Sequence, residues 1–184
     1  ANYQGINSIG LNAAPELADL TGDGLLDLIV GERSGRIRFF ENIGTTTSAE
    51  FDANPSIGTL GGIDVSYFCC LGNAAPRIIK NAAFGTGTYL FVGSSEKQIK
   101  IYAIPTNLAD TFDLVDSIHI LADRITPIFD DFNNDEIYDL LIGTGEGGVK
   151  YFQRNANYPV GTEPLVNPNT QMIFNVFPNP TNDQ

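Results

Sequence analysis

Residues 14–42 read Ala-Pro-Glu-Leu-Ala-Asp-Leu-Thr-Gly-Asp-Gly-Leu-Leu-Asp-Leu-Ile-Val-Gly-Glu-Arg-Ser-Gly-Arg-Ile-Arg-Phe-Phe-Glu-Asn. The stretch opens with a short strand that ends at Leu20, and a tight loop rich in aspartate and glycine follows. The largely apolar run 26–30 predicts a buried strand, and the alternating residues 36–40 predict another strand after a glycine turn. The stretch therefore predicts three short strands, with an acidic loop between the first two.

The same pattern occurs twice more along the chain. Pro15, Asp27, Gly31 and Phe40 recur as Pro127, Asp139, Gly143 and Phe152, each 112 positions later. A degenerate copy begins at Pro76, 61 positions after Pro15. It keeps the strands but has Lys80, Ala82 and Phe84 where the first copy has Asp19, Thr21 and Asp23. A constant register over so many positions indicates a true internal repeat.

Short strands between glycine, asparagine and proline turns, with no amphipathic helix, predict an all-β fold. Such strands could form a sandwich or a propeller, and a repeat of roughly 50 residues favours propeller blades of four-stranded antiparallel sheets. Residues 1–11, 62–65 and 116–121 would supply outer strands. About three blades are present, whereas closed propellers use about four to eight. We therefore expect a larger, about seven-bladed ring, with upstream blades or partner chains on the open faces.

The predicted divisions of the chain follow the repeats. Residues 1–13 form the outer strand of a preceding or closing blade, 14–74 the first repeat, 75–125 the second, and 126–154 a third that lacks its outer strand. Residues 155–171, rich in asparagine, proline and threonine, are a predicted linker, and 172–184 begin a new element.

Composition narrows the classes of partner and reaction. The 184 residues include 22 acidic and 10 basic side chains, for a formal charge of −12, which argues against nucleic acid and is compatible with cation binding. No apolar run reaches transmembrane length. His119 is the only histidine, so neither a Ser-His-Asp site nor a histidine-rich zinc site is expected, and we predict no catalytic set within this chain. Cys69 and Cys70 are adjacent and could be two small apolar residues or a vicinal disulfide.

The acidic loops carry the candidate chemistry. Side-chain oxygens occupy alternate positions, with a backbone carbonyl between the last two, as calcium requires. The predicted ligands are Asp19, Thr21, Asp23, the Leu25 carbonyl and Asp27, and in the third repeat Asp131, Asn133, Asp135, the Ile137 carbonyl and Asp139. Two alternatives are plain turn formation and a catalytic pair of carboxylates. Gly24 suits a turn with positive φ, whereas Glu136 at the matching position does not, which weakens the second site.

These residues also resemble a known family. The pattern Pro-x-x-x-Asp-x-x-Gly-Asp-Gly-x-x-Asp-Leu-x-Val-Gly, followed by Gly-x-Ile-x-x-Phe, is similar to the FG-GAP or VCBS repeat and covers about residues 14–152. The resemblance implies β-propeller blades that hold calcium in this loop, as in integrin α-chain propellers. It places calcium on the same ten residues.

The end of the sequence carries a second resemblance. Residues 174–181 read Phe-Asn-Val-Phe-Pro-Asn-Pro-Thr, similar to the opening of the C-terminal sorting domain of Bacteroidota type IX secretion cargo. That resemblance implies export by the type IX machinery to the cell surface or the medium; the alternative is a proline-rich turn before another module. The function expected is a non-catalytic propeller for adhesion or for binding a protein or glycan. The alternative is an accessory propeller of a secreted hydrolase or lyase whose catalytic domain lies elsewhere.

Overall fold

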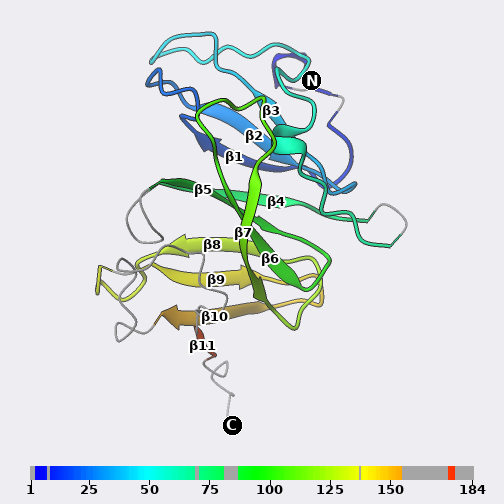
Figure 1. Ribbon diagram of the computed structural model, residues 1–184, viewed down its shortest axis with the longest axis vertical. Helices are drawn as coiled ribbons and strands as arrows, with labels where there is room; N and C mark the ends of the chain where they lie inside the picture. The colour runs from blue at the N-terminus through cyan, green and yellow to red at the C-terminus, as the bar shows by residue number, and fades with distance from the viewer. Residues whose placement is uncertain are drawn as a thin grey trace.

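The computed structural model describes residues 3–7, 9–68, 71–80, 87–136, 138–154 and 174–176. These residues form three antiparallel sheets, none of them closed, which follow one another along the long axis of the molecule (Figure 1). The first sheet contains β1 (Ala14–Ala18), β2 (Asp27–Gly31) and β3 (Ile37–Phe40). The second contains β4 (Ala75–Lys80), β5 (Thr88–Gly93), β6 (Gln98–Ala103) and β7 (Asp113–His119). The third contains β8 (Thr126–Asp130), β9 (Asp139–Gly143), β10 (Val149–Arg154) and β11 (Phe174–Val176).

The internal repeat is confirmed by the strand register. In each sheet the residue before the proline pairs with the glycine that ends the second strand, in the pairs Ala14 with Gly31, Ala75 with Gly93 and Thr126 with Gly143. A backbone hydrogen bond is repeated as well, at 2.8 Å each time, from Arg33 N to Leu11 O, Ser95 N to Gly72 O and Gly145 N to Asp123 O. The all-β prediction is therefore correct, and the second copy keeps the sheet although its acidic residues are lost.

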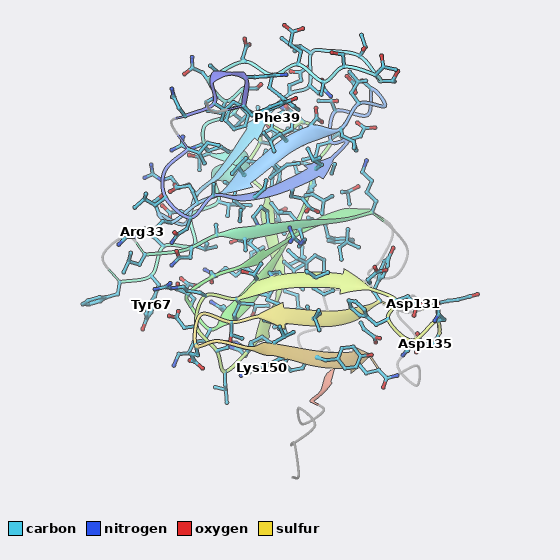
Figure 2. All side chains as sticks on the ribbon, turned by 180° about the vertical axis from the view of Figure 1, so that it is seen from behind. Arg33, Phe39, Tyr67, Asp131, Asp135 and Lys150 are labelled. Carbon is cyan, nitrogen blue, oxygen red and sulfur yellow. The ribbon has the colours of Figure 1, made fainter. Side chains whose placement is uncertain are left out.

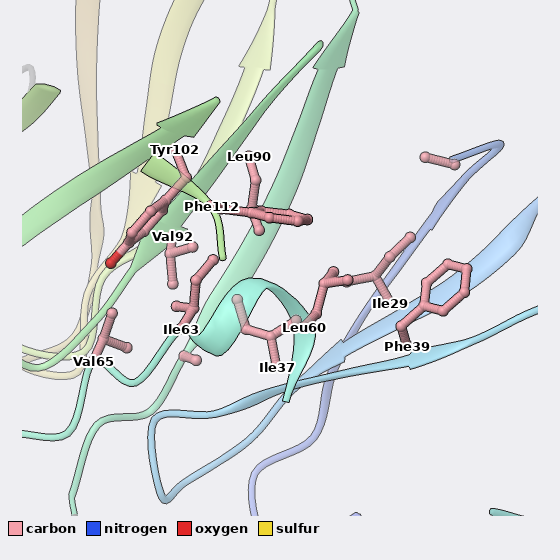
Figure 3. Packing of buried hydrophobic residues seen from close by; sticks show 12 residues of the cluster. Ile29, Ile37, Phe39, Leu60, Ile63, Val65, Leu90, Val92, Tyr102 and Phe112 are labelled. Carbon is pink, nitrogen blue, oxygen red and sulfur yellow. The ribbon is translucent and has the colours of Figure 1, made fainter. Parts of the chain in front are cut away.

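Apolar side chains fill the spaces between the sheets. One buried cluster joins Ile29, Ile37 and Phe39 of the first sheet to Leu90 and Val92 of the second. Figure 3 shows these side chains meeting around Leu60 and Ile63, which lie in and after the 3₁₀ turn η2 (Leu60–Gly62). The next cluster joins the second sheet to the third in the same way, through the residues Phe91, Ile99, Ile101, Leu140, Ile142 and Phe152. Stacking of sheet faces, rather than one central core, holds this part of the chain together.

The described residues among 1–11 do not form the outer strand that the sequence predicted. Within their described part the chain makes a 3₁₀ turn, η1 (Tyr3–Gly5), and Ile6 and Ile9 pack against a third cluster that contains Val30 and Phe40. Val30 and Phe40 lie on the face of the first sheet that is turned away from the second sheet. Because no other sheet in the described part of the chain covers that apolar face, the N-terminal segment gains more by covering it than by extending a strand.

The fourth strands also differ from prediction. Residues 62–65 form no strand; isolated bridges from Ile57 to Phe39 and from Asp64 to Arg36 flank the turn η2, where Gly61 has φ 62°. In the second sheet β7 confirms the expected outer strand, displaced towards the N-terminus. The third repeat, residues 126–154, contains three strands, and the fourth strand of its sheet is β11, which comes from the segment that the sequence assigned to a new element. The predicted linker 155–171, Cys69 and Cys70 lie outside the described residues.

No helix in the described residues is long and apolar enough to span a membrane.

Candidate metal centre: the acidic loops

The two acidic loops join the first strand to the second strand in the first and third sheets. In Figure 2, Asp131 and Asp135 of the third sheet lie at the opposite end of the sheets from Arg33 and Tyr67. Lys80 is the last residue of β4 in the second sheet, and its ammonium group donates a hydrogen bond to the carbonyl oxygen of Asp19. A positively charged side chain of the neighbouring sheet therefore contacts the first loop.

The first loop is folded around its own aspartates. The Asp19 carboxylate accepts the backbone N–H groups of Gly22 at 2.6 Å and Gly24 at 3.2 Å, and Asp23 accepts that of Leu25 at 2.8 Å. Gly22 and Gly24 have φ of 80° and 87°, which glycine adopts without steric cost. Turn formation, the alternative raised by the sequence, is therefore one role of these aspartates, and it leaves each carboxylate with lone pairs for a further ligand.

The acidic loop of the third repeat resembles the first, with positive φ at the equivalent positions and a first aspartate that caps two loop amides. Asp131 accepts the N–H groups of Asp135 at 3.1 Å and Glu136 at 2.9 Å, and the Asn133 side chain bonds Asp135 on both its oxygen and its nitrogen. Asn134 and Glu136 have φ of 60° and 65°, the positions of Gly22 and Gly24 in the first loop. Glu136 is thus held in the left-handed region despite the expected mismatch. Ile137, whose carbonyl was a predicted ligand, lies outside the described residues.

The last aspartate of each loop is fully buried, with Asp27 and Asp139 both 0 % exposed. Asp27 accepts three backbone N–H groups, those of Leu20 at 2.9 Å, Thr21 at 3.1 Å and Asn42 at 3.0 Å. Such a carboxylate fixes both ends of the loop and the end of β3 at once. The structure therefore brings Thr21 and Asp27 together through the backbone of Thr21.

Asp139 accepts a side-chain hydrogen bond, because the Tyr151 hydroxyl donates to its carboxylate at 2.6 Å. Burial, followed by this hydrogen bond and by the negative charges of Asp139, Asp135 and Asp131, raises the pKa of Tyr151 to about 12. Three of the predicted ligands thus act electrostatically on one phenol. Phe132 packs edge-on against the Tyr151 ring, with the ring centres 6.1 Å apart, and fixes its position.

Sequence reasoning missed Asn42, which is 4 % exposed. Besides donating its backbone N–H to Asp27, it donates its side-chain amide to the Leu26 carbonyl and accepts the N–H groups of Gly44 and Glu50. An asparagine two residues before a glycine, and two residues after the end of a strand, was the available signal. Asn42 couples the acidic loop to the segment that follows β3.

In the ranges that the structure describes, no three acidic, histidine or cysteine side chains are grouped so as to hold a metal ion. The loop carboxylates are directed at backbone amides, yet the donor set is made of oxygens only, which is the chemistry that calcium prefers. The chain matches no family model, no curated protein and no solved structure.

Proposed function

We propose that this chain is a non-catalytic, calcium-stabilised binding region made of propeller-type blades, acting in adhesion or in binding a protein or glycan. The observation that carries the proposal is a set of features that the acidic loops of the first and third repeats share, including positive φ at equivalent positions. Each begins with an aspartate that caps two loop amides and ends with an aspartate that is 0 % exposed. These features and the oxygen positions are kept together even though the loop sequences differ at both glycines.

Calcium would act here as a structural ion. The residues that would hold it are Asp19, Thr21, Asp23, the Leu25 carbonyl and Asp27, and in the third repeat Asp131, Asn133, Asp135, the Ile137 carbonyl and Asp139. Its charge would offset the mutual repulsion of the carboxylates and would join the ends of two strands through one loop. Extracellular modules bind calcium at about 10⁻⁴–10⁻³ M, so this role suits a calcium-rich medium.

The buried polar residues support a structural role for these sites. Asp27 and Asn42 are each less than 5 % exposed, and both accept backbone N–H groups of neighbouring residues. Ligand specificity of such a module would therefore lie in exposed loops rather than in these networks.

Calcium titration tests the proposal. Millimolar calcium at ten times its dissociation constant should stabilise the fold by about 1.4 kcal/mol by mass action, or roughly 3–6 °C in melting temperature. Asp23→Asn should remove the part of this effect that comes from the first loop, because the amide oxygen still accepts the Leu25 N–H but the charge is lost. Asp52→Asn, an exposed aspartate outside the loops, is the matched control. Melting and calorimetry indifferent to calcium in all three proteins would refute the metal role.

Export is proposed from residues 174–181, and secreted or outer-membrane surface localisation follows from it. Because Phe174–Val176 also form β11, deleting them would disturb the third sheet as well as any sorting signal. Replacing Pro178 and Asn179 with alanine in the full-length gene leaves β11 unchanged. That double variant should remain in the periplasm, and unchanged secretion would contradict type IX export.

A further inference from the structure

Each stacking contact between sheets is made at a glycine. A Cβ atom added to Gly31 would overlap the Ala74 carbonyl and lie 2.7 Å from Pro76 Cδ. A Cβ on Gly93 would likewise overlap the Ile125 carbonyl and lie 2.7 Å from Pro127 Cδ. Because glycine has no side chain, each of these positions leaves a hollow, which we call a socket. The carbonyl group two residues before the proline of the next sheet, and the proline itself, fit into it.

A backbone hydrogen bond accompanies each socket. Ala74 N donates to Glu32 O at 3.0 Å, and Ile125 N donates to Ser94 O at 3.2 Å, in each case to the carbonyl of the residue after the glycine. The residues that enter the sockets are buried, including Ala74, Ala75, Pro76 and Pro127. Two independent copies of the same contact thus define what the socket accepts: an apolar strand with a proline two residues after the donating N–H.

The third sheet has the same socket at Gly143. Its glycine has the same register, paired with Thr126 and Val149, but in the described part of the chain a Cβ there would meet only Thr126, at 3.9 Å. Apolar side chains on the same face are open to solvent, with Ile128 43 % and Val149 56 % exposed. The equivalent of Val149 in the first sheet, Ile37, is 0 % exposed because the second sheet covers it.

The matching strand edge is exposed at the other end of the molecule. Ala13, Pro15 and Leu17 occupy the positions of Ala74, Pro76 and Ile78, yet all three are exposed, Leu17 by 56 %. Ile6 and Ile9 cover the middle of this sheet but leave β1 uncovered beside a groove of about 680 Å³ that Pro15 and Leu17 help to line. The described residues therefore include both a vacant socket and the strand edge that fits it, on opposite ends.

We propose that copies of this chain associate head to tail, with β1 of one copy docked in the Gly143 socket of the next. The contact continues the stacking already present twice within the chain, and it does not depend on calcium in the acidic loops. Because the N-terminal segment covers part of the first sheet, the contact between copies involves mainly β1, so we expect the association to be weak. Such a contact joins different surfaces, so association continues beyond a dimer unless a ring closes.

Sedimentation velocity over a concentration series tests the docking. The wild-type chain should rise from the monomer mass of 19.9 kDa as its concentration increases. Gly143→Ala fills the socket without an internal clash, and Leu17→Glu places a charge on the docking edge at a site that is exposed in the monomer; each should remain monomeric. The matched controls Gly58→Ala, which meets open space, and Leu121→Glu, which is 88 % exposed, should associate like the wild type.

Mixing the two blocked variants gives the decisive result. Gly143→Ala retains an intact β1 edge and Leu17→Glu retains an intact socket, so an equimolar mixture should form a one-to-one dimer and nothing larger. Circular dichroism of each variant confirms that it is folded before mixing. A wild type that stays monomeric at every concentration overturns the proposal, as does association that both variants leave unchanged or a mixture that remains monomeric.

Discussion

Alanine substitution at the three equivalent glycines separates the internal sheet contacts from the open one. At Gly31 the new methyl group would overlap the Ala74 carbonyl and lie 2.7 Å from Pro76, where ordinary contact begins at 3.4 Å. The second sheet must then move away by about an ångström. Overpacking of this kind costs about 1–3 kcal/mol. Loss of the hydrogen bond from Ala74 N to Glu32 O adds about 1 kcal/mol.

We therefore expect Gly31→Ala and Gly93→Ala to lower the free energy of unfolding by about 3 kcal/mol each, or roughly 6–12 °C in melting temperature. Gly143→Ala should be neutral or should stabilise by up to about 1 kcal/mol, because it restricts the unfolded chain without a clash. Urea denaturation followed by circular dichroism measures all three. Equal stabilities for Gly31→Ala and Gly143→Ala would refute the stacked arrangement of the sheets.

Three further predictions concern the acidic loops. Asp27→Asn should lower the free energy of unfolding by about 2–4 kcal/mol in urea denaturation, because an amide nitrogen would face at least one buried N–H donor. The control Asp52→Asn, at an exposed position, should change it by less than about 0.5 kcal/mol. Equal effects of the two substitutions would contradict the capping role of Asp27. Glu136→Gly should stabilise by about 1 kcal/mol in thermal melting, since glycine relieves the left-handed backbone at φ 65°, and any loss of stability would count against that strain. The pKa of Tyr151 lies at about 12 in the folded chain against an ordinary 10.0, so stability should be unaffected below pH 10 and fall as the pH rises towards 12. Tyr151→Phe should lack that part of the alkaline loss, and identical pH profiles would show that the phenol is not perturbed.

The sequence alone determined the repeat, the first three strands of each sheet and the equivalent positions of the loop aspartates. A two-residue alternation and a fixed register need only local information, because each strand's partner lies within about twenty residues. The proline, the glycine and the last aspartate of each loop therefore fall on equivalent positions by their spacing alone. The same local information indicated oxygen donors at alternate loop positions.

Only the tertiary structure decided what covers each sheet. Residues 1–11 alternate weakly, yet Ile6 and Ile9 pack on Val30 and Phe40, because an apolar face without a neighbour must be covered by whatever chain can reach it. β11 joins β10 although the residues between them were predicted to be a linker and β11 itself was assigned to a new element, so the repeat pattern did not indicate this pairing. The meaning of the three glycines likewise depends on the neighbouring sheet. Among the described residues, Gly31 and Gly93 contact the next sheet and Gly143 contacts none. All three nevertheless end the second strand of their sheets in the same register.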